Sequence, residues 1–485
     1  MLVTDVDHEQ TCDPTAASSG FEQFRRRAQA ALFSMMPEHI ERLGWGGARI
    51  ASHQLERCRA LLDSAIEGSR FHRRRLGHID PSYFELEELA TIPVMTKAEM
   101  MSAFDAVVTD VRVTREKAER AIEMTTTTPL PIDGEFMVLT SGGSSGCRGL
   151  FVFEPAAFAT FGTTLLRPTM ARMHATGGPP PDGLTIAMVA AQSPVHATGS
   201  APMMLEGSPI NFVSVPVTLP IAEIVKRLNQ LQPQAVYGYP SVLARLALEQ
   251  NADRLQISPN SVTATSETLR PHLRSTIRHG FGVPIINTFG SSEGLVGVSP
   301  PDDEIITFAD DVCIVELVDD EDQPVKPGAV SSSVLVTNLY NHVQPLIRYR
   351  IEDRFIRRPD AIEHGHLRAE VNGRAADTFS FGSIDIHPHV IASALAHAVA
   401  VTDYQVRQTT NGVDIEVVLA ERTDPERIAR TTRDALALAG LHDPTVQVTR
   451  VDELPRHPKT GKLAQFVPLN PLFRNGDARG VCGTR

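Results

Sequence analysis

Short apolar runs alternate with helical patterns between residues 136 and 353, and this alternation constrains the fold more than any other feature of the chain. Strand-like runs include 137–139 and 184–189, and helical patterns include 221–231 and 241–251. Such alternation predicts helices layered on a sheet, because the segment that joins two parallel strands must cross a face of the sheet. We therefore predict an α/β fold with a large, multi-layer N-terminal domain.

The chain changes character after Arg374. Two strand patterns flank Asn411-Gly412, a pair typical of a tight hairpin turn. Asp424-Pro425 is a helix start, since aspartate caps helices and proline suits the first helical position. These patterns predict a small, mobile α+β domain. The predicted division is a flexible arm at 1–20, an N-terminal domain at 21–376, a C-terminal lid domain at 377–470 and a tail at 471–485.

The charge balance argues against one class of partner. The 485 residues include 46 Lys and Arg against 58 Asp and Glu, a formal net charge of −12. A general nucleic-acid binder needs a basic surface that displaces phosphate counterions. We therefore expect no nucleic-acid partner, although a few local cations and backbone amides can still hold an anionic nucleotide.

Cysteine usage and apolar run lengths indicate the compartment. The five cysteines are scattered, with no C-x-x-C pair and no zinc-like spacing to histidine. Reduced thiols are the simplest account, and they are typical of the cytoplasm. The apolar runs are too short to span a bilayer, and the first residues lack a secretory pattern. We expect a soluble cytoplasmic protein with no membrane partner.

A glycine- and serine-rich segment is the first candidate site. Thr140 to Gly146 contains three glycines and four hydroxyl side chains, and Arg148 follows. Such a loop can turn its amides toward one centre and hold phosphate oxygens. A plain surface loop is the simpler alternative. The same letters also fit the nucleophile elbow of α/β-hydrolases, but that elbow needs a helix after it, whereas residues 150–153 predict a strand.

The second candidate site follows the apolar run at 283–286. It presents Phe289, two serines and Glu293. An aromatic ring can stack on a base, and a carboxylate can hold Mg²⁺. A core phenylalanine beside a turn is the alternative. Three charged stretches follow in order, at 345–354, 373–377 and 454–463, and each alone could be a surface element.

In their order and spacing, these five motifs resemble those of the adenylate-forming superfamily of acyl-CoA synthetases, nonribosomal adenylation domains and luciferases. The segments 69–76, 92–99, 237–241 and 345–349 resemble its phenylacetate–CoA ligase-like branch more narrowly. The resemblance covers about residues 50–468.

The resemblance implies a two-step reaction. A carboxylate attacks the α-phosphate of ATP, which gives an acyl-adenylate and pyrophosphate, and an acceptor then displaces AMP. We expect a small aromatic acid and coenzyme A as the acceptor. The alternative is a free-standing adenylating enzyme of secondary metabolism whose acceptor is an amine, a carrier-protein thiol or nitrite activated toward a diazo product. A catalytically reduced family member that serves as a binding partner is a third reading, and the oligomeric state stays open, a homodimer included.

The resemblance also implies roles for individual residues. Lys462, Glu293 and Arg148 would be catalytic, with Mg²⁺ held by Glu293, and Lys459 is the alternative lysine. Asp377 would be the hinge of the lid domain. The acid or acceptor would contact His196, Tyr237, Gly238, Tyr239 and Pro240. The nucleotide would contact Thr140, Ser141, Gly142, Ser144, Ser145, Gly146, Ser266, Glu267, Thr268, Asn287, Thr288, Phe289, Gly290, Ser291, Ser292, Asp353 and Arg374.

Two departures from the family pattern stand at these positions. Arg148 lies where the phosphate loop usually ends in Lys-Pro, and Glu352 replaces a common glycine beside Asp353. No Cys-His cluster follows Glu293, so the zinc site of some relatives is not expected.

Overall fold

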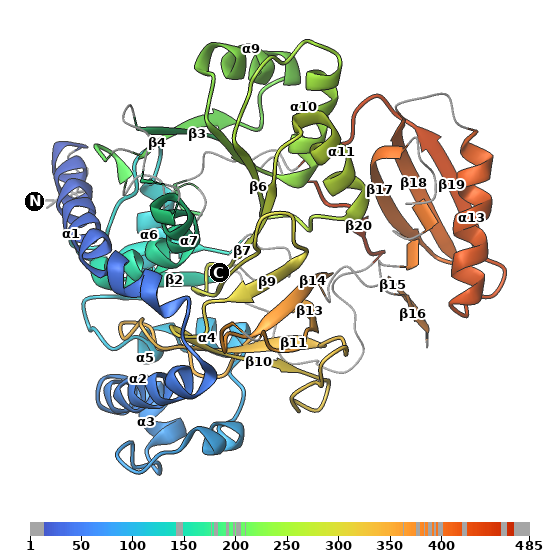
Figure 1. The fold of residues 1–485 in the computed structure, drawn as a ribbon. Coiled ribbons are helices and arrows are strands. Elements are labelled where there is room, and N and C mark those ends of the chain that lie inside the picture. Colours follow the sequence, from blue (N-terminus) through green and yellow to red (C-terminus); the bar gives the residue numbers. More distant parts are fainter. Residues whose placement is uncertain are drawn as a thin grey trace, which may run out of the picture.

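The computed structural model confirms the predicted mixed α/β fold (Figure 1). It describes residues 14–141, 149–175, 177–178, 183–190, 194–196, 199, 205–208, 210–361, 363–374, 379–382, 384–386, 390–391, 394–395, 401–419, 424–456 and 463–469. None of the helices in these ranges has a stretch that is long and apolar enough to cross a membrane.

A nine-stranded sheet forms the centre of the large domain. Its order is β13 (Asp353–Arg357), β14 (Arg368–Arg374), β9 (Ile305–Phe308), β8 (Val296–Val298), β7 (Ile285–Gly290), β6 (Ser261–Thr265), β5 (Ala235–Gly238), β3 (Leu184–Ala190) and β4 (Ile210–Pro216). Strands β4, β3, β5, β6 and β7 are parallel, so their carboxyl ends meet at one edge of the sheet. That edge is the usual location of a ligand site in an open α/β sheet.

Helices cover both faces of the parallel strands (Figure 1). One face packs on α9 (Ile221–Leu231), α10 (Pro240–Asn251) and α11 (Pro271–Phe281), and Val262 and Ala264 are buried there. On the other face lies α7 (Pro155–Ala175), which in turn packs on α1 (Pro14–Arg42). Helix α1 begins inside the predicted 1–20 arm, so that prediction now concerns residues 1–13 alone, which lie outside the described ranges.

The rest of the large domain supports the edge of this sheet. It contains a three-stranded sheet, one long helix and a set of shorter ones. The strands are β10 (Cys313–Val318), β11 (Ser333–Asn338) and β12 (Tyr349–Ile351), and the helices are α2 (Gly47–Gly68), α3 (Arg70–Leu76), η1 (Leu86–Thr91), α4 (Lys97–Ser102), α5 (Phe104–Val107) and α6 (Arg115–Met124).

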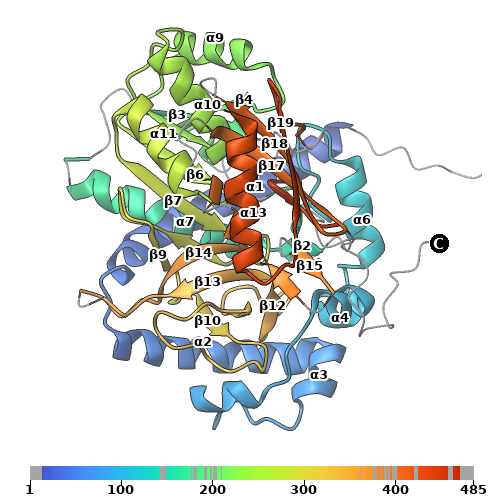
Figure 2. The same ribbon diagram turned by 90° about the vertical axis from the view of Figure 1, so that its right-hand side faces the viewer.

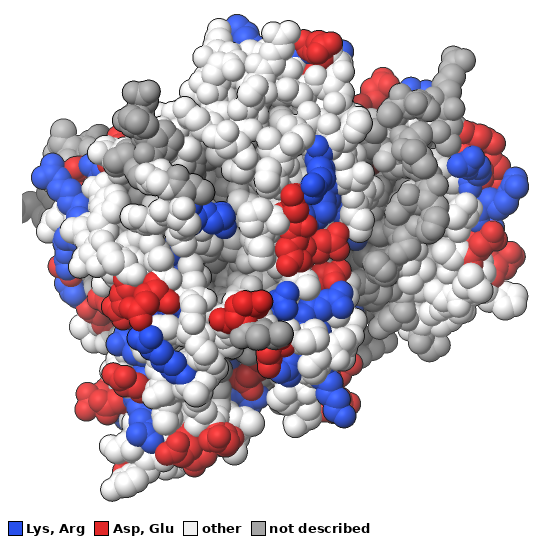
Figure 3. Space-filling view, in the orientation of Figure 1, with Lys and Arg blue, Asp and Glu red and all other residues white. Residues whose placement is uncertain are grey.

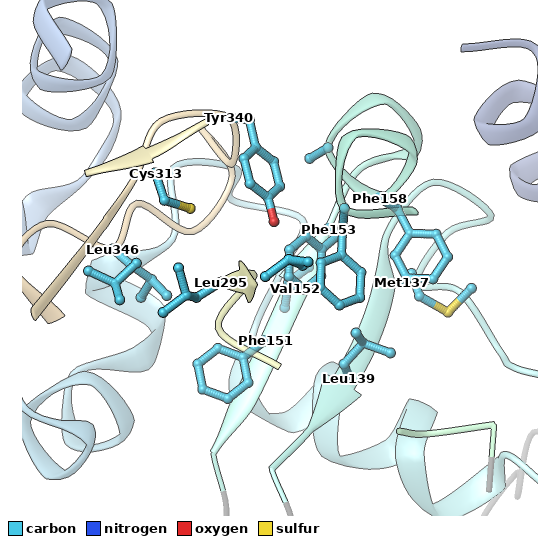
Figure 4. Close-up of a cluster of buried hydrophobic side chains, with 14 of the residues drawn as sticks. Met137, Leu139, Phe151, Val152, Phe153, Phe158, Leu295, Cys313, Tyr340 and Leu346 are labelled. Atoms are coloured by element: carbon cyan, nitrogen blue, oxygen red, sulfur yellow. The ribbon is translucent and has the colours of Figure 1, made fainter. Parts of the chain in front are cut away.

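The hairpin of β1 (Met137–Thr140) and β2 (Leu150–Phe153) is embedded in the largest core. Every residue of both strands is buried, and Figure 4 shows their side chains packed against Phe158, Leu295 and Tyr340. Burial of the hairpin fixes the two strand ends, Thr140 and Leu150, from which the segment at its tip leaves. That segment is the predicted phosphate loop.

The described residues from 379 onward form a two-stranded sheet (β15–β16) and a four-stranded sheet (order β19-β18-β17-β20) that share a separate core. The elements are β15 (Phe379–Phe381), β16 (Ile384–Ile386), β17 (Val401–Thr409), β18 (Gly412–Leu419), α13 (Pro425–Leu438), β19 (Thr445–Arg450) and β20 (Phe466–Val467). Figure 2 shows α13 lying along the sheet of β17, β18 and β19. The boundary between 376 and 377 stays a prediction, because residues 375–378 lie outside the described ranges.

Of two local predictions for this domain, the helix cap is confirmed and the hairpin is confirmed with its turn shifted by one residue. Asp424 accepts a hydrogen bond from the Glu426 amide (3.0 Å) and caps α13, with Pro425 at the first position. The β17–β18 hairpin turns one residue earlier than expected, at 410–411, because Thr409 pairs with Gly412. Gly412 has φ 157° and lies so close to the Thr445 carbonyl that a Cβ there would be 1.8 Å from the oxygen, so this position requires glycine.

Candidate active site

The phosphate-loop hairpin is closed by a reciprocal pair of hydrogen bonds. The Ser141 amide donates to the Gly149 carbonyl (3.1 Å), and the Gly149 amide donates to Ser141 Oγ (2.9 Å). The antiparallel strand β2 follows the loop, so the hydrolase alternative, which needs a helix there, is wrong. The predicted residues Gly142, Ser144, Ser145, Gly146 and Arg148 lie outside the described ranges.

Thr140 joins three parts of the predicted site. Its carbonyl oxygen accepts a hydrogen bond from Ser292 Oγ (3.1 Å) and lies 3.1 Å from His196 Nδ1. His196 Nδ1 also lies 3.4 Å from the Thr140 hydroxyl, so the ring contacts both the carbonyl and the side chain of this residue. The structure thus brings the start of the phosphate loop, the Phe-Gly-Ser-Ser-Glu motif and the predicted substrate histidine together.

Phe289 stands at the end of β7 within an aromatic group. Its ring is 5.1 Å from that of Phe355 and 6.4 Å from that of Phe308, in both cases nearly perpendicular. Edge-to-face contacts fix the plane of the ring. The Phe289 side chain is only partly buried, so this fixed ring keeps a surface for stacking.

Glu293 is a buried carboxylate. Burial raises the pKa of Glu293, the nearby Lys97 lowers it, and Asp353 raises it again. An anion removed from water is stabilised by a cation, and carboxylate oxygens suit Mg²⁺. Glu293 therefore fits the predicted role of metal ligand.

Gly294 determines how close Glu293 lies to β11. It has φ +97°, and a Cβ there would lie 2.3 Å from the Tyr340 hydroxyl and 2.4 Å from Asn338 Nδ2. Asn338 donates to the Glu293 carbonyl (3.0 Å), and Tyr340 donates to the Gly294 carbonyl (2.8 Å). These bonds position the backbone that carries the Glu293 carboxylate.

Lys97 was not among the predicted site residues. The segment before it is attached to β12 by two backbone hydrogen bonds, from the Met95 amide to the Arg348 carbonyl and from the Arg350 amide to the Met95 carbonyl, each 2.9 Å long. This contact between distant segments brings the Lys97 charge close enough to lower the pKa of Glu293. The segment 92–99 was noted for its resemblance to one branch of the superfamily, but the sequence does not indicate that Lys97 lies near Glu293.

Asp353 and Arg374 face each other across the β13–β14 ladder. Asp353 is half-buried and close enough to Glu293 to affect its pKa. The Arg374 side chain lies outside the described part of the structure. Ser266, at the carboxyl end of β6, has φ +65°, a conformation that is uncommon outside glycine and that clusters at functional sites.

Glu267 connects the large domain to the C-terminal domain. One carboxylate oxygen accepts from the Ser241 amide (3.1 Å), and the other accepts from the Leu463 amide (3.1 Å). Arg456 lies 3.9 Å from the same carboxylate and donates to Ser241 Oγ (2.9 Å). The described residues on both sides of segment 457–462, which carries Lys459 and Lys462, thus contact Glu267 or its immediate neighbour.

The Arg456 guanidinium also lies 3.5 Å from Asp403, a carboxylate of β17 that is 6% exposed. Burial raises the pKa of Asp403 from 3.8 to about 7; Arg456 opposes the shift, and Glu267 adds to it. The folded protein therefore holds a proton that the unfolded chain releases between pH 4 and 7. Stability from this group rises as the pH falls through that window.

Replacing Asp403 with asparagine should remove this pH dependence. We expect the free energy of unfolding of the unmodified protein, relative to Asp403→Asn, to rise by about 1.4 kcal/mol for each pH unit from pH 7 toward pH 4. Urea titrations across that range measure it. The exposed Asp414→Asn on neighbouring β18 is the control and should show the slope of the unmodified protein; equal slopes for Asp403→Asn would contradict the assignment.

The predicted substrate residues 237–240 do not all face a cavity. Tyr237 lines a cavity, whereas Tyr239 is fully buried in the core beneath α10 and Pro240 begins that helix. Gly238 fits closely against the Val189 carbonyl, 2.8 Å from where a Cβ would lie. Lys462 and Asp377 lie outside the described residues.

A cavity of about 470 Å³ opens beside these motifs. Thr265, Thr288 and Gly290 line it, and they lie on the strands that lead into Ser266-Glu267 and Phe289. The surface shown in Figure 3 carries acidic and basic side chains side by side, whereas the cavity lining is mostly apolar. The arrangement combines a polar, charged edge with an apolar chamber.

Comparisons with known proteins bear on this arrangement. No family model matches the sequence. Protein CapK of Staphylococcus aureus is 28% identical over 132 residues, which make up 27% of this chain and 28% of CapK. Indoleacetate–lysine synthetase of Pseudomonas savastanoi is 29% identical over 157 residues, 31% of this chain and 37% of that protein. The matched segments thus span well under half of either relative.

Similarity to solved structures covers most of the chain. A 2-hydroxyisobutyryl-CoA ligase in the postadenylation state, with an acyl-AMP bound, superimposes with a TM-score of 0.66 at 16% identity, over 88% of this chain and 90% of that one. The same ligase in the thioesterification state, with acyl-AMP and CoA, gives 0.54 at 18% identity, over 88% and 91%. These matches confirm the predicted fold of the adenylate-forming ligases. The phenylacetate–CoA ligase-like branch stays a prediction.

Proposed function

We propose that the protein is an AMP-forming ligase that activates a carboxylic acid with ATP and transfers the acyl group to an acceptor. The observation that carries this proposal is the junction at the carboxyl ends of β6 and β7. There an apolar cavity reaches Thr288 and Gly290, on either side of Phe289, and Ser292 of the same motif donates to the Thr140 carbonyl at the end of β1. An acid in the cavity would have its carboxylate beside the phosphates of a nucleotide bound at the sheet edge.

In the first step, each of the site residues would have a different role. The acid's carboxylate oxygen attacks the α-phosphorus of ATP, and pyrophosphate leaves. Phe289 would stack on the adenine, and Asp353 would accept hydrogen bonds from the ribose hydroxyls. Glu293 would hold Mg²⁺, which when bound supplies positive charge to the phosphate oxygens. Lys97 stabilises the ionised form of Glu293, and Lys462 would neutralise charge that develops at the α-phosphate.

We propose coenzyme A as the acceptor, as in the 2-hydroxyisobutyryl-CoA ligase whose fold this chain shares. An amine acceptor is the second candidate, and the similarity to indoleacetate–lysine synthetase favours it. An ATP–pyrophosphate exchange screen over carboxylic acids tests the first step. Mass analysis of products formed with coenzyme A or with amines then separates the acceptors, and absence of exchange with every acid would reject the proposal.

Two substitutions test the nucleotide site. Phe289→Ala should weaken AMP binding by about 1–3 kcal/mol, the usual value of an aromatic stack on a base. Asp353→Ala should cost about 1.5–3 kcal/mol, since it removes charge-assisted hydrogen bonds. Calorimetric titration with AMP measures both. The exposed Asp360→Ala, on the turn between β13 and β14, is the matched control; unchanged affinity in Phe289→Ala and Asp353→Ala would place the nucleotide elsewhere.

A further inference from the structure

We propose that the acid has an elongated apolar tail, which lies between α7 and the central sheet and extends well beyond the length of a single aromatic ring. This inference rests on the proposed function for the reaction, but the binding that it predicts can be measured without it. The sequence predicted a small aromatic acid as the substrate, whereas this proposal assigns a longer, apolar acid. The geometry of the cavity carries it.

One wall of the cavity is formed by alternate residues of parallel strands. Ser261, Thr263 and Thr265 of β6 line it, as do Ile286 and Thr288 of β7. Alternate residues of a strand share one face, and the strand rises about 3.3 Å per residue. The segment from Ser261 to Thr265 therefore gives this wall a length of about 13 Å.

The opposite wall is one face of α7. Phe161, Leu165, Thr169 and Met173 recur at a spacing of four residues, and Leu166 and Met170 lie beside them. Residues at this spacing lie above one another on a helix. From Phe161 to Met173 this wall is about 18 Å long, since a helix rises 1.5 Å per residue. The cavity is thus a channel that runs along the strands.

The polarity of the channel sets the orientation of the acid. Thr265 and Thr288 lie at the end beside the nucleotide motifs, where the carboxylate must be for the reaction. Met188, Phe212, Ile286 and Met170 line the interior. Among the described residues of the lining, Arg172 is the only one with a charged side chain, and its guanidinium donates to Thr169 Oγ1 (3.0 Å). The interior therefore suits an uncharged hydrocarbon tail.

The volume of the channel favours a long acid over a short one. The volume of about 470 Å³ is many times the roughly 10–15 Å³ that a cavity needs to hold one water. A single-ring acid held at the mouth would leave most of the apolar walls against water. Each further methylene that enters the channel should tighten binding about fourfold, until the far end is reached.

Thr263 marks the middle of the channel. It lies opposite Tyr237 of β5 and Ile286 of β7 in the sheet register, and all three line the cavity. A phenylalanine at this position would fill the cross-section and leave the mouth open. Thr263→Val keeps the volume of the side chain and removes the hydroxyl, so it is the matched control.

The test is calorimetric titration of the whole protein, without ATP, with straight-chain acids from acetate to palmitate and with benzoate. We expect affinity to rise along the series and to exceed that for benzoate by about fourfold for each methylene that reaches beyond the ring, about a thousandfold for five. Thr263→Phe should abolish this gain and leave acetate and benzoate unchanged, while Thr263→Val keeps the gain. Benzoate binding as tightly as the long acids, or a full gain in Thr263→Phe, would overturn the proposal.

A second measurement uses the unmodified protein, so it does not depend on the folding of a variant. A long acid with a photoreactive group at its tail should label α7 residues such as Met170 or Met173, and labelling confined to other segments would also overturn the proposal. Long acids that bind as expected but support no pyrophosphate exchange would leave the channel in place and reject the ligase proposal instead.

Discussion

Replacing Lys462 with alanine is expected to lower the rate of adenylation by about a hundred- to a thousandfold, the usual effect of removing one preorganised group that stabilises transition-state charge. The proposed task of Lys462 is to neutralise charge shared by the acid's carboxylate and the α-phosphate. That interaction is strongest in the transition state, so kcat should fall while ATP binding stays nearly intact. Pyrophosphate exchange and ATP titration measure the two quantities.

The contacts around Glu267 support this assignment. The Leu463 amide, one residue after Lys462, donates to the Glu267 carboxylate, and Arg456 on the other side of the segment contacts the same group. Glu267 follows β6, the strand whose end borders both the cavity and the nucleotide motifs. The neighbours of Lys462 are thus attached to the edge of the sheet where the chemistry is proposed.

Lys459→Ala is the matched control, since it removes the same charge from the same segment. It should leave adenylation unchanged. The second half-reaction, started from preformed acyl-adenylate, should be far less sensitive to Lys462→Ala, because we propose that the lid domain rotates about Asp377 between the two steps. Loss of adenylation in Lys459→Ala but not in Lys462→Ala would reverse the assignment. If neither lysine mattered, the enzyme proposal would give way to a binding role.

Local sequence patterns predicted the parts of the fold that depend on near neighbours. The hairpin around the phosphate loop, the cap at Asp424 and the layered sheet follow from alternation, turn residues and capping chemistry. The motif order was sufficient to identify the fold. Each of these features depends on residues that are close together in the sequence, or on the order in which such short motifs follow one another.

The features that the sequence did not reveal depend on distant contacts. Glu267 meets Leu463 only because the two domains pack together, and Lys97 approaches Glu293 only because its segment is attached to β12. The channel is a further example. Thr263 and Ile286 read as ordinary strand residues, and their exposure to a cavity is determined by how far α7 stands from the sheet.

A buried ion pair holds α7 in position, so we expect its removal to lower the stability of the protein strongly. Arg167 of α7 is 2% exposed and donates to both oxygens of the fully buried Asp311, at 2.7 and 2.6 Å. It also donates to the His39 carbonyl of α1 (3.3 Å). Burial raises the pKa of Asp311, but the Arg167 hydrogen bonds and charge outweigh this effect and hold it at about 2. The pair joins α1, α7 and the segment before β10.

Asp311 also belongs to the one group of described side chains whose geometry could hold a metal ion, with Asp310 and His366. The ligand atoms already have protein partners. Arg167 takes both Asp311 oxygens, and His366 contacts Asp310 through Nδ1 and the Arg42 carbonyl through Nε2. The cluster is therefore a structural junction, and its contribution should appear in stability.

Arg167→Met and Asp311→Leu should each destabilise the protein by about 3–5 kcal/mol, because each leaves the other charge buried without its hydrogen-bonded partner, although Arg42 stays 3.7 Å from Asp311. The double variant should recover most of this loss, since a buried pair replaced by apolar side chains is close to neutral. Urea unfolding at pH 7 measures all three, and Arg227→Met, which breaks an exposed pair with Glu223 on α9, is the control that should change little. Additive losses in the double variant would mean that the two side chains act separately.

Because α7 forms one wall of the channel, the single variants should also lose affinity for long acids. Their affinity for acetate-sized acids should stay closer to that of the unmodified protein.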